Sequence, residues 1–275
     1  MRAVVVGYGK FGSSVTDLLL QDGHDVVVID RNQNVINEIN DTRDVLAVCA
    51  NAADYDVLKD IGMKSVDVCI SCTAVDEINV LVCAYAKAMG AKQVITSIRN
   101  QKYESDGVRF LREHFGIDII INPDHITAEA IYDILAEEEA SDVIIVGGSR
   151  IAGYLSEMLV KQGVAVKILE KYEEKSIFLS NHLPDDVIVI CADGANHENL
   201  VAEGIDNCDA FVALTNTDEE NILTSLLASE HNVRTIVTKI NKYAYTDIIS
   251  GLNLPHVISP RNVTSEIAVK SINAQ

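Results

Sequence analysis

Apolar runs rich in β-branched residues alternate with helix-forming stretches along the whole chain. In the first half these runs lie near residues 2–6, 25–30, 45–50, 66–72, 93–98 and 117–121. Continuous apolar runs are typical of strands that are buried on both faces. Their alternation with helices predicts a parallel sheet covered by helices on each side. The pattern therefore predicts a doubly wound α/β fold.

The pattern restarts near residue 141, so the chain contains an internal repeat. Three pairs of equivalent positions mark it: Gly7 and Gly147, Asp30 and Glu170, and Thr73 and Thr215. The offset is 140 residues for the first two pairs and 142 for the third, a difference that a change in loop length explains. We therefore predict two tandem Rossmann-like domains with doubly wound parallel sheets, at residues 1–140 and 141–275.

A glycine-rich loop follows the first apolar run, and its residues are Gly7, Tyr8, Gly9, Lys10, Phe11 and Gly12. In a Rossmann unit the first glycine permits a tight turn, the second lets a pyrophosphate approach the backbone, and the third lets helix pack on strand. Unpaired N–H groups at the start of the next helix favour an anion. Asp30 ends the second run, at the spacing where a carboxylate accepts the ribose hydroxyls. The first repeat is therefore predicted to bind a nucleotide; the alternative is that its glycines serve packing alone.

The corresponding loop of the second repeat departs from this pattern. Its residues are Gly147, Gly148, Ser149, Arg150, Ile151 and Ala152. The motif tolerates alanine at its third position, whereas the side chain of Ser149 occupies the space that a pyrophosphate would enter. Glu170 keeps the ribose-binding acid. The second site is thus predicted to bind a nucleotide weakly, to bind a different one, or to be vestigial.

The amino-acid composition excludes some classes of binding partner. The net charge of −19 and the pI near 4.6 argue against direct binding to nucleic acid or to an anionic membrane surface. No apolar run approaches the ~18–20 residues of a membrane span, and no signal peptide precedes the first strand. We therefore expect a soluble, cytosolic protein. Cys69 and Cys72 form a C-x-x-C, but they lie in an apolar strand pattern that favours packing over redox or zinc chemistry.

Taken together, these motifs resemble the TrkA-type potassium-uptake regulators, which carry RCK/KTN nucleotide-binding domains in tandem. The resemblance covers nearly the whole chain and rests on the order of several features. They are the loop at 7–12, the segment 23–26 leading to Asp30, the segment 51–54, Thr73-x-x-Asp76-x-x-Asn79, Ile98-Arg99 followed by Tyr103, and Asn122-Pro123. The chain departs from the family in one respect. A smaller lobe usually follows each family domain, but here the helix after Pro123 leads almost directly into the next strand.

The resemblance implies a function. It is that of a cytoplasmic regulatory subunit, peripheral on the inner face of the membrane, which binds a membrane-embedded K⁺ transporter subunit of the Trk/Ktr type. Such a subunit senses NAD(H) or ATP/ADP and gates transport through a ligand-driven conformational change. It also implies a homo-oligomer in which paired lobes form a ring.

The resemblance further implies residues around the nucleotide. Lys10 would face a phosphate, and Asn51 and Ala52 would line the adenine. The remaining members of the expected site are Thr73, Ala74 and Arg99, which would complete the pocket, Arg31 beside Asp30, and Thr215 in the second repeat.

Two other classes of function remain open. A NAD-dependent oxidoreductase would need a substrate-binding region and an acid or base beside the nicotinamide, and two bare nucleotide folds leave no residues for that region. A structural assembly protein with non-functional sites would bind no nucleotide, which the intact first loop disfavours. We predict no catalytic residue and no metal ligand. Asp30 also disfavours a 2′-phosphate, and therefore NADP, but does not separate NAD from ATP.

Overall fold

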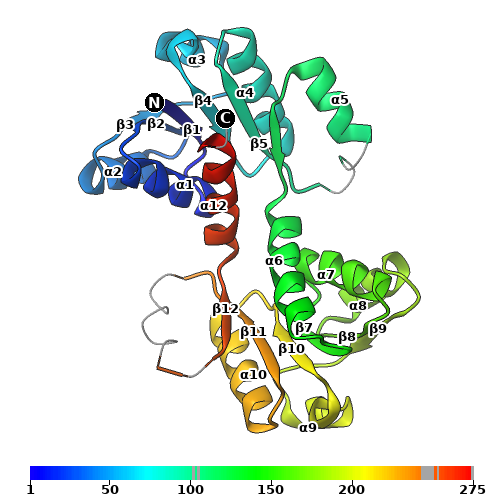
Figure 1. Ribbon diagram of the computed structural model, residues 1–275. Helices are drawn as coiled ribbons and strands as arrows, with labels where there is room; N and C mark the ends of the chain where they lie inside the picture. The colour runs from blue at the N-terminus through cyan, green and yellow to red at the C-terminus, as the bar shows by residue number, and fades with distance from the viewer. Residues whose placement is uncertain (101–102, 104–105, 243–250, 253, 274–275) are drawn as a thin grey trace. The chain divides into compact units, whose positions relative to one another are not determined.

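The chain folds into two compact units, each built around one parallel six-stranded sheet, in a computed structural model (Figure 1). The structure describes residues 1–100, 103, 106–242, 251–252 and 254–273. Unit 1 contains Met1–Pro123 together with Thr264–Gln275, and unit 2 contains Asp124–Val263. The predicted fold class, tandem Rossmann-like α/β, is confirmed.

Unit 1 orders its strands β3-β2-β1-β4-β5-β6, and every neighbouring pair is parallel. The strands are β1 (Arg2–Val6), β2 (Asp25–Asp30), β3 (Leu46–Cys49), β4 (Val68–Ser71), β5 (Gln93–Ser97) and β6 (Ile119–Ile121). The helices between them are α1 (Lys10–Gln21), α2 (Gln33–Thr42), α3 (Tyr55–Ile61), the 3-10 helix η1 (Met63–Ser65), α4 (Asp76–Ala88) and α5 (Asp106–Phe115). The strand order reverses between β1 and β4, which is where such sheets bind ligands.

Unit 2 repeats this order, as β9-β8-β7-β10-β11-β12, again with all neighbours parallel. Its strands are β7 (Asp142–Val146), β8 (Ala165–Glu170), β9 (Val187–Cys191), β10 (Ala210–Ala213), β11 (Thr235–Lys239) and β12 (His256–Ile258). Its helices include α7 (Arg150–Lys161), α8 (Glu173–His182), α9 (His197–Ala202), the 3-10 helix η3 (Ile205–Asn207) and α10 (Asp218–Glu230).

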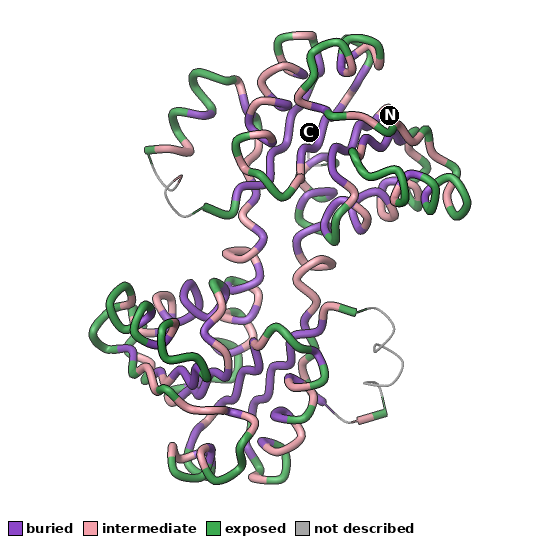
Figure 2. Tube along the Cα trace, turned by 180° about the vertical axis from the view of Figure 1, so that it is seen from behind, coloured by how far each residue is buried: buried purple, intermediate pink, exposed green. Residues whose placement is uncertain are grey.

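Both faces of each sheet are buried. In β7, Val143 and Ile145 belong to one hydrophobic cluster, whereas Ile144 and Val146 belong to another on the opposite face. Side chains alternate between the faces of a strand, so a strand covered on both sides needs apolar residues at every position. Figure 2 shows the consequence, with buried positions concentrated along the strands and exposed positions in the loops.

Each sheet is completed by a helix from the other repeat. Helix α6 (Pro123–Glu137) places Ala128, Ile131 and Leu135 in the cluster that contains Val143, within unit 2. Most of helix α12 (Pro260–Asn273) belongs to unit 1, where the Ser265 hydroxyl lies 2.8 Å from that of Ser14 on α1. The compact units therefore exchange their last helices. The predicted domain boundary between residues 140 and 141 marks the point at which the sequence pattern restarts. That boundary stays a prediction.

The connection between α6 and β7 is short. Residues 138–141 alone separate the two elements. The departure from the family pattern that we expected at this point is therefore present in the structure, because four residues cannot form a lobe. Among the described residues, no helix combines the length and the apolar character needed to cross a bilayer.

Candidate functional site

The glycine loop of unit 1 forms a tight turn at the carboxyl end of β1. Gly7 has a φ of +91°, which favours glycine, and its N–H donates to the Ile29 carbonyl at 2.8 Å. A Cβ at Gly7 would lie 2.9 Å from the amide nitrogen of Thr73. The first glycine therefore lets the loop pack against the segment that follows β4.

The second and third glycines of this loop face different surroundings. A Cβ at Gly12 would lie 1.9 Å from the Gly7 carbonyl oxygen and 2.9 Å from the Cys72 sulfur, so the contact between loop and helix requires glycine. A Cβ at Gly9 would meet nothing within 4 Å. Gly9 is the N-cap of α1, and no side chain caps that helix. The start of α1 therefore has no side-chain cap and has open space at Gly9, an arrangement suited to a phosphate.

Asp30 is fixed at the end of β2 by two backbone amides. Its Oδ2 accepts from the Tyr8 N–H at 2.8 Å, and its Oδ1 accepts from the Asn32 N–H at 2.9 Å. These bonds attach the carboxylate to the glycine loop. Each oxygen of a carboxylate has a second lone pair, so Asp30 retains the capacity to accept hydroxyl donors such as those of a ribose.

Helix α4 fixes the loops that follow β4 and β5. The fully buried Asn79 accepts from the Thr73 N–H at 2.7 Å and donates from Nδ2 to the Ser97 carbonyl at 2.9 Å. Asp76 Oδ2 accepts from the backbone N–H groups of Arg99 and Asn100, at 3.0 and 2.9 Å. The site prediction did not include Asp76 and Asn79, although both stand in the motif Thr73-x-x-Asp76-x-x-Asn79 and recur as Asp218 and Asn221.

The other residues expected in the first site follow the carboxyl ends of neighbouring strands. Because β3, β2, β1, β4 and β5 are adjacent and parallel, these ends share one edge of the sheet. Phe11 and Ala52 are buried there, and the exposed members are Lys10, Arg31, Asn51, Ala74 and Arg99. Their contacts with a ligand stay a prediction.

The equivalent loop of unit 2 keeps the turn but fills the end of the helix. Gly147 has a φ of +96° and donates to the Leu169 carbonyl at 2.9 Å, as Gly7 does to Ile29. Ser149, which replaces Gly9, caps α7 by accepting from the Ala152 N–H at 3.3 Å. A hydroxyl of the chain thus takes one of the donors that a phosphate would use.

Glu170 is already engaged by groups of its own unit. Its Oε2 accepts from the Gly148 N–H at 2.9 Å and pairs with Lys175 Nζ at 2.7 Å, and its Oε1 accepts from the Tyr172 N–H at 3.0 Å. Burial raises the pKa of Glu170, but the Lys175 bond and the two amides outweigh it, so this pKa lies below its ordinary value. The position of Lys175 is Val35 in the first repeat, which offers no such cation.

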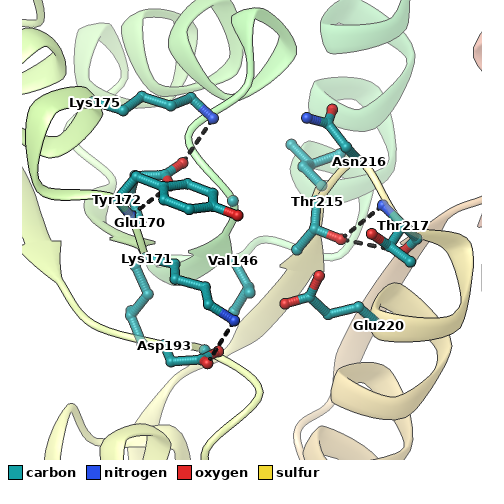
Figure 3. Close-up of a pocket in the computed structure, with 14 residues that line it drawn as sticks. Val146, Glu170, Lys171, Tyr172, Lys175, Asp193, Thr215, Asn216, Thr217 and Glu220 are labelled. Atoms are coloured by element: carbon teal, nitrogen blue, oxygen red, sulfur yellow. Dashed lines mark hydrogen bonds and ion pairs between the residues drawn. The ribbon is translucent and has the colours of Figure 1, made fainter.

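A cavity of about 130 Å³ opens beside Glu170 (Figure 3). It lies at the carboxyl ends of β7, β8 and β10 and is lined in part by Glu170, Lys171, Asp193 and Glu220. Lys171 Nζ and Asp193 Oδ2 form an ion pair of 2.9 Å, and Lys171 lowers the pKa of Asp193. Two of the three carboxylates are thus paired with lysines inside the cavity.

The remaining residues predicted for the second site have different surroundings. Thr215 keeps the arrangement of Thr73, since its N–H donates to Asn221 Oδ1 at 2.8 Å. Arg150 pairs with Asp124 at 2.9 Å, and Ile151 is buried. Their role in binding stays a prediction.

The C-x-x-C pair belongs to the packing of unit 1. Burial raises the pKa of the Cys69 and Cys72 thiols to about 12, so both are protonated at neutral pH. The Cys72 thiol donates to the Gly7 carbonyl at 3.2 Å, beneath the glycine loop. These cysteines are unsuited to nucleophilic or redox chemistry.

Comparison with known families matches the TrkA-N domain twice, at residues 3–123 and 143–260. The Trk system potassium uptake protein TrkA homolog of Archaeoglobus fulgidus is 25% identical over 350 residues, covering 96% of this chain and 79% of the relative. The Trk system potassium uptake protein TrkA of Vibrio alginolyticus is 24% identical over 357 residues, covering 96% and 77%. Both alignments are longer than the 275 residues of this chain, so the relatives contain residues that have no counterpart here.

Solved structures share the fold. The crystal structure of GsuK bound to ADP superimposes with a TM-score of 0.81 at 18% identity, covering 99% of this chain and 69% of that one. The GsuK channel bound to NAD gives a TM-score of 0.81 at 14% identity, covering 99% and 63%. At such identities the likeness establishes the arrangement of helices and strands and nothing finer.

Proposed function

This chain belongs to the TrkA-N domain family, and we propose that it is the nucleotide-sensing regulatory subunit of a Trk/Ktr-type potassium uptake system. The observation that carries this proposal is the first glycine loop. There an uncapped helix end and a fixed carboxylate, Asp30, meet at the switch point of the sheet. The names of the relatives, all parts of a Trk system, supply the transport context.

The ligand that we propose for the first site is NAD(H) or ATP/ADP. Phosphates would lie over Gly9 at the start of α1, and Asp30 would accept the adenosine ribose hydroxyls. A structural neighbour of the same fold has been solved with ADP and another with NAD, which supports an adenine nucleotide without choosing between them.

We assign the second site a lesser share of binding. Ser149 caps the helix that would hold the phosphates, and Lys175 neutralises the acid that would hold the ribose. A nucleotide entering unit 2 would have to displace both contacts. The proposal therefore predicts one tightly bound nucleotide per chain.

Regulation would follow from a shift in population. A nucleotide that favours one conformation of the subunit over another would alter the transporter to which it is bound, and equal affinity for both would change nothing. The subunit would lie at the cytoplasmic face of the membrane through its contact with the embedded K⁺ transporter. We also propose a homo-oligomeric ring; a monomer in light scattering at working concentration would contradict it.

Calorimetric titration with NAD⁺, NADH, ATP and ADP tests the proposal. We expect Asp30→Ala to weaken the bound nucleotide about 10- to 100-fold, because it removes charge-assisted hydrogen bonds. Glu170→Gln is the matched control in unit 2 and should leave this affinity unchanged. A loss of affinity in Glu170→Gln but not in Asp30→Ala would place the site in unit 2. If none of the four nucleotides binds, a structural assembly protein becomes the better interpretation. Turnover of NADH with a substrate would favour the oxidoreductase.

A further inference from the structure

Two imidazoles face each other on the surface of unit 2, away from the cavity. The Nε2 atoms of His197 and His231 lie 2.9 Å apart, and Nδ1 of His231 lies 2.6 Å from Oδ1 of Asp206. His197 begins α9, His231 follows α10, and Asp206 lies in η3. Three separate elements thus bring these side chains together, and none of the three lines the cavity beside Glu170.

The first repeat provides an internal comparison. The equivalents of Asp206, His197 and His231, each 142 residues earlier, are Lys64, Tyr55 and Met89. The local fold is the same, since α3, η1 and α4 have the same order and lengths close to those of α9, η3 and α10. All three positions differ together, so the fold of the repeat does not itself require this cluster.

The bond between His231 and Asp206 favours one tautomer of a neutral His231 ring. When the Nδ1–H of neutral His231 donates to Asp206, the lone pair of that ring lies on Nε2 and points at His197. In the structure the Nε2–H of His197 can donate to that lone pair. If His197 instead carries its proton on Nδ1, the Nε2 lone pairs of both rings point at one solvent-accessible position.

We propose that His197 and His231 form a binding site for a borderline divalent transition-metal ion such as Zn²⁺ or Cu²⁺, with Asp206 as the positioning residue. A tetrahedral ion about 2.0–2.1 Å from each nitrogen would separate the two Nε2 atoms by roughly 3.3 Å. That requires an opening of a few tenths of an ångström between side chains of which one is exposed. Imidazole is a ligand that Zn²⁺ and Cu²⁺ accept readily, unlike Mg²⁺ or Ca²⁺.

The protein supplies two ligands here, and water supplies the others. In the part of the chain that the structure describes, no group of three or more His, Cys, Asp or Glu side chains could hold a metal. The proposed site is therefore open and exchangeable, unlike a closed structural zinc site. Its occupation would join the start of α9 to the end of α10.

Calorimetric titration of the chelator-treated, tag-free full chain with ZnCl₂ tests the site, with Cu²⁺ electron paramagnetic resonance as a second readout. We expect one Zn²⁺ per chain and nitrogen hyperfine structure from Cu²⁺. Binding should be lost in His197→Gln and in His231→Gln. Asp206→Asn should weaken it about 10- to 100-fold, because the carboxylate orients and polarises the ligating ring.

His182→Gln is the matched control, since it removes another exposed imidazole from the same unit, one stacked on Phe178. It should leave the titration unchanged. His197 is exposed, so its variant decides the question even where His231→Gln unfolds. Absence of binding by the unmodified chain, or equal binding by all variants, would overturn the proposal.

Discussion

Gly9 and Ser149 occupy the same position in the two repeats, immediately before the helix that follows each glycine loop. The two residues produce opposite surfaces at that helix end. With Gly9 the first amides of α1 have no side-chain acceptor, whereas the hydroxyl of Ser149 satisfies an amide of α7. A single hydroxymethyl group therefore separates a surface suited to an external anion from one that the chain has already filled.

Exchange of this residue should convert the first surface into the second. We expect Gly9→Ser to leave the free energy of unfolding within about 0.5 kcal/mol, because serine and glycine differ little as N-caps. The same change should weaken nucleotide binding at least about tenfold, because the hydroxyl competes with a phosphate for the amides. Calorimetry and thermal unfolding measure the two effects.

The reverse exchange, Ser149→Gly, is the control for that experiment. It should not create a second tight site, because Lys175 would still pair with Glu170. Unchanged nucleotide affinity in Gly9→Ser would mean that phosphates do not approach α1 at this glycine.

The first turns of helices α4 and α10 fix the loops at the switch point of each sheet. Asn79 and Asn221 are fully buried and make the same bonds, to Thr73 and Ser97 in one unit and to Thr215 and Lys239 in the other. A primary amide suits this position because it accepts from one loop and donates to the other.

Asn79→Asp should therefore disturb the first site through its loops. The change replaces a donor by an acceptor that faces the Ser97 carbonyl, and we expect a loss of about 1–3 kcal/mol in the free energy of unfolding. Nucleotide affinity should fall as well. Asn221→Asp, the matched change in unit 2, should cost similar stability without altering the affinity; an equal fall in affinity would contradict the assignment of the ligand to unit 1. Urea unfolding and calorimetry provide the measurements.

A second pair of equivalent residues, Asp67 and Asp209, stabilises the starts of the central strands. Asp67 accepts from Lys92 and from the Arg2 N–H, and Asp209 accepts from the Ser141 hydroxyl and the Asp142 N–H. These bonds lower the pKa of both carboxyls, led by the Lys92 bond for Asp67 and the Ser141 bond for Asp209.

A lowered pKa in the folded state makes stability depend on pH in one direction. The contribution of Asp67 and Asp209 is fully present above the ordinary pKa of about 3.9 and is lost as the pH falls through the lowered folded values. We expect the melting temperature to fall below about pH 4, and less steeply in Asp67→Asn or Asp209→Asn than in the unmodified chain. Parallel melting curves for all three proteins would contradict this.

Across the whole chain, the exchange of α6 and α12 makes unit 1 depend on residues distant in sequence, because most of α12 follows the whole of unit 2. Ala268 in α12 is fully buried and belongs to unit 1. We expect Ala268→Asp to destabilise unit 1 by about 3–5 kcal/mol, because it buries an unpaired charge. Hydrogen exchange should accelerate in α1 but not in α7. Asn273→Asp adds the same charge at an exposed position and should change neither helix.

The sequence was sufficient to predict the sheets but not the destination of their last helices. Apolar runs located the six strands of the first repeat, and the restart of the pattern near residue 141 indicated the same fold in the second. Alternation of strand and helix says which segments are helical, whereas Ser265 meets Ser14 through a contact across 251 residues that no local pattern encodes. For the same reason the pairing of Lys175 with Glu170 was not predicted, since one turn of α8 had to place that lysine over the acid.

The exchanged helices have a consequence for how such a chain could arise. Two copies of a protein made of one repeat would reach the same arrangement if they traded their final helices, which is domain swapping. Tandem duplication of such a homodimer would yield the present division of the chain directly. A homodimer dissociates on dilution, whereas its covalent counterpart does not. After fusion the two repeats would also be able to change in sequence independently, so that one loop could keep Gly9 while the other acquired Ser149.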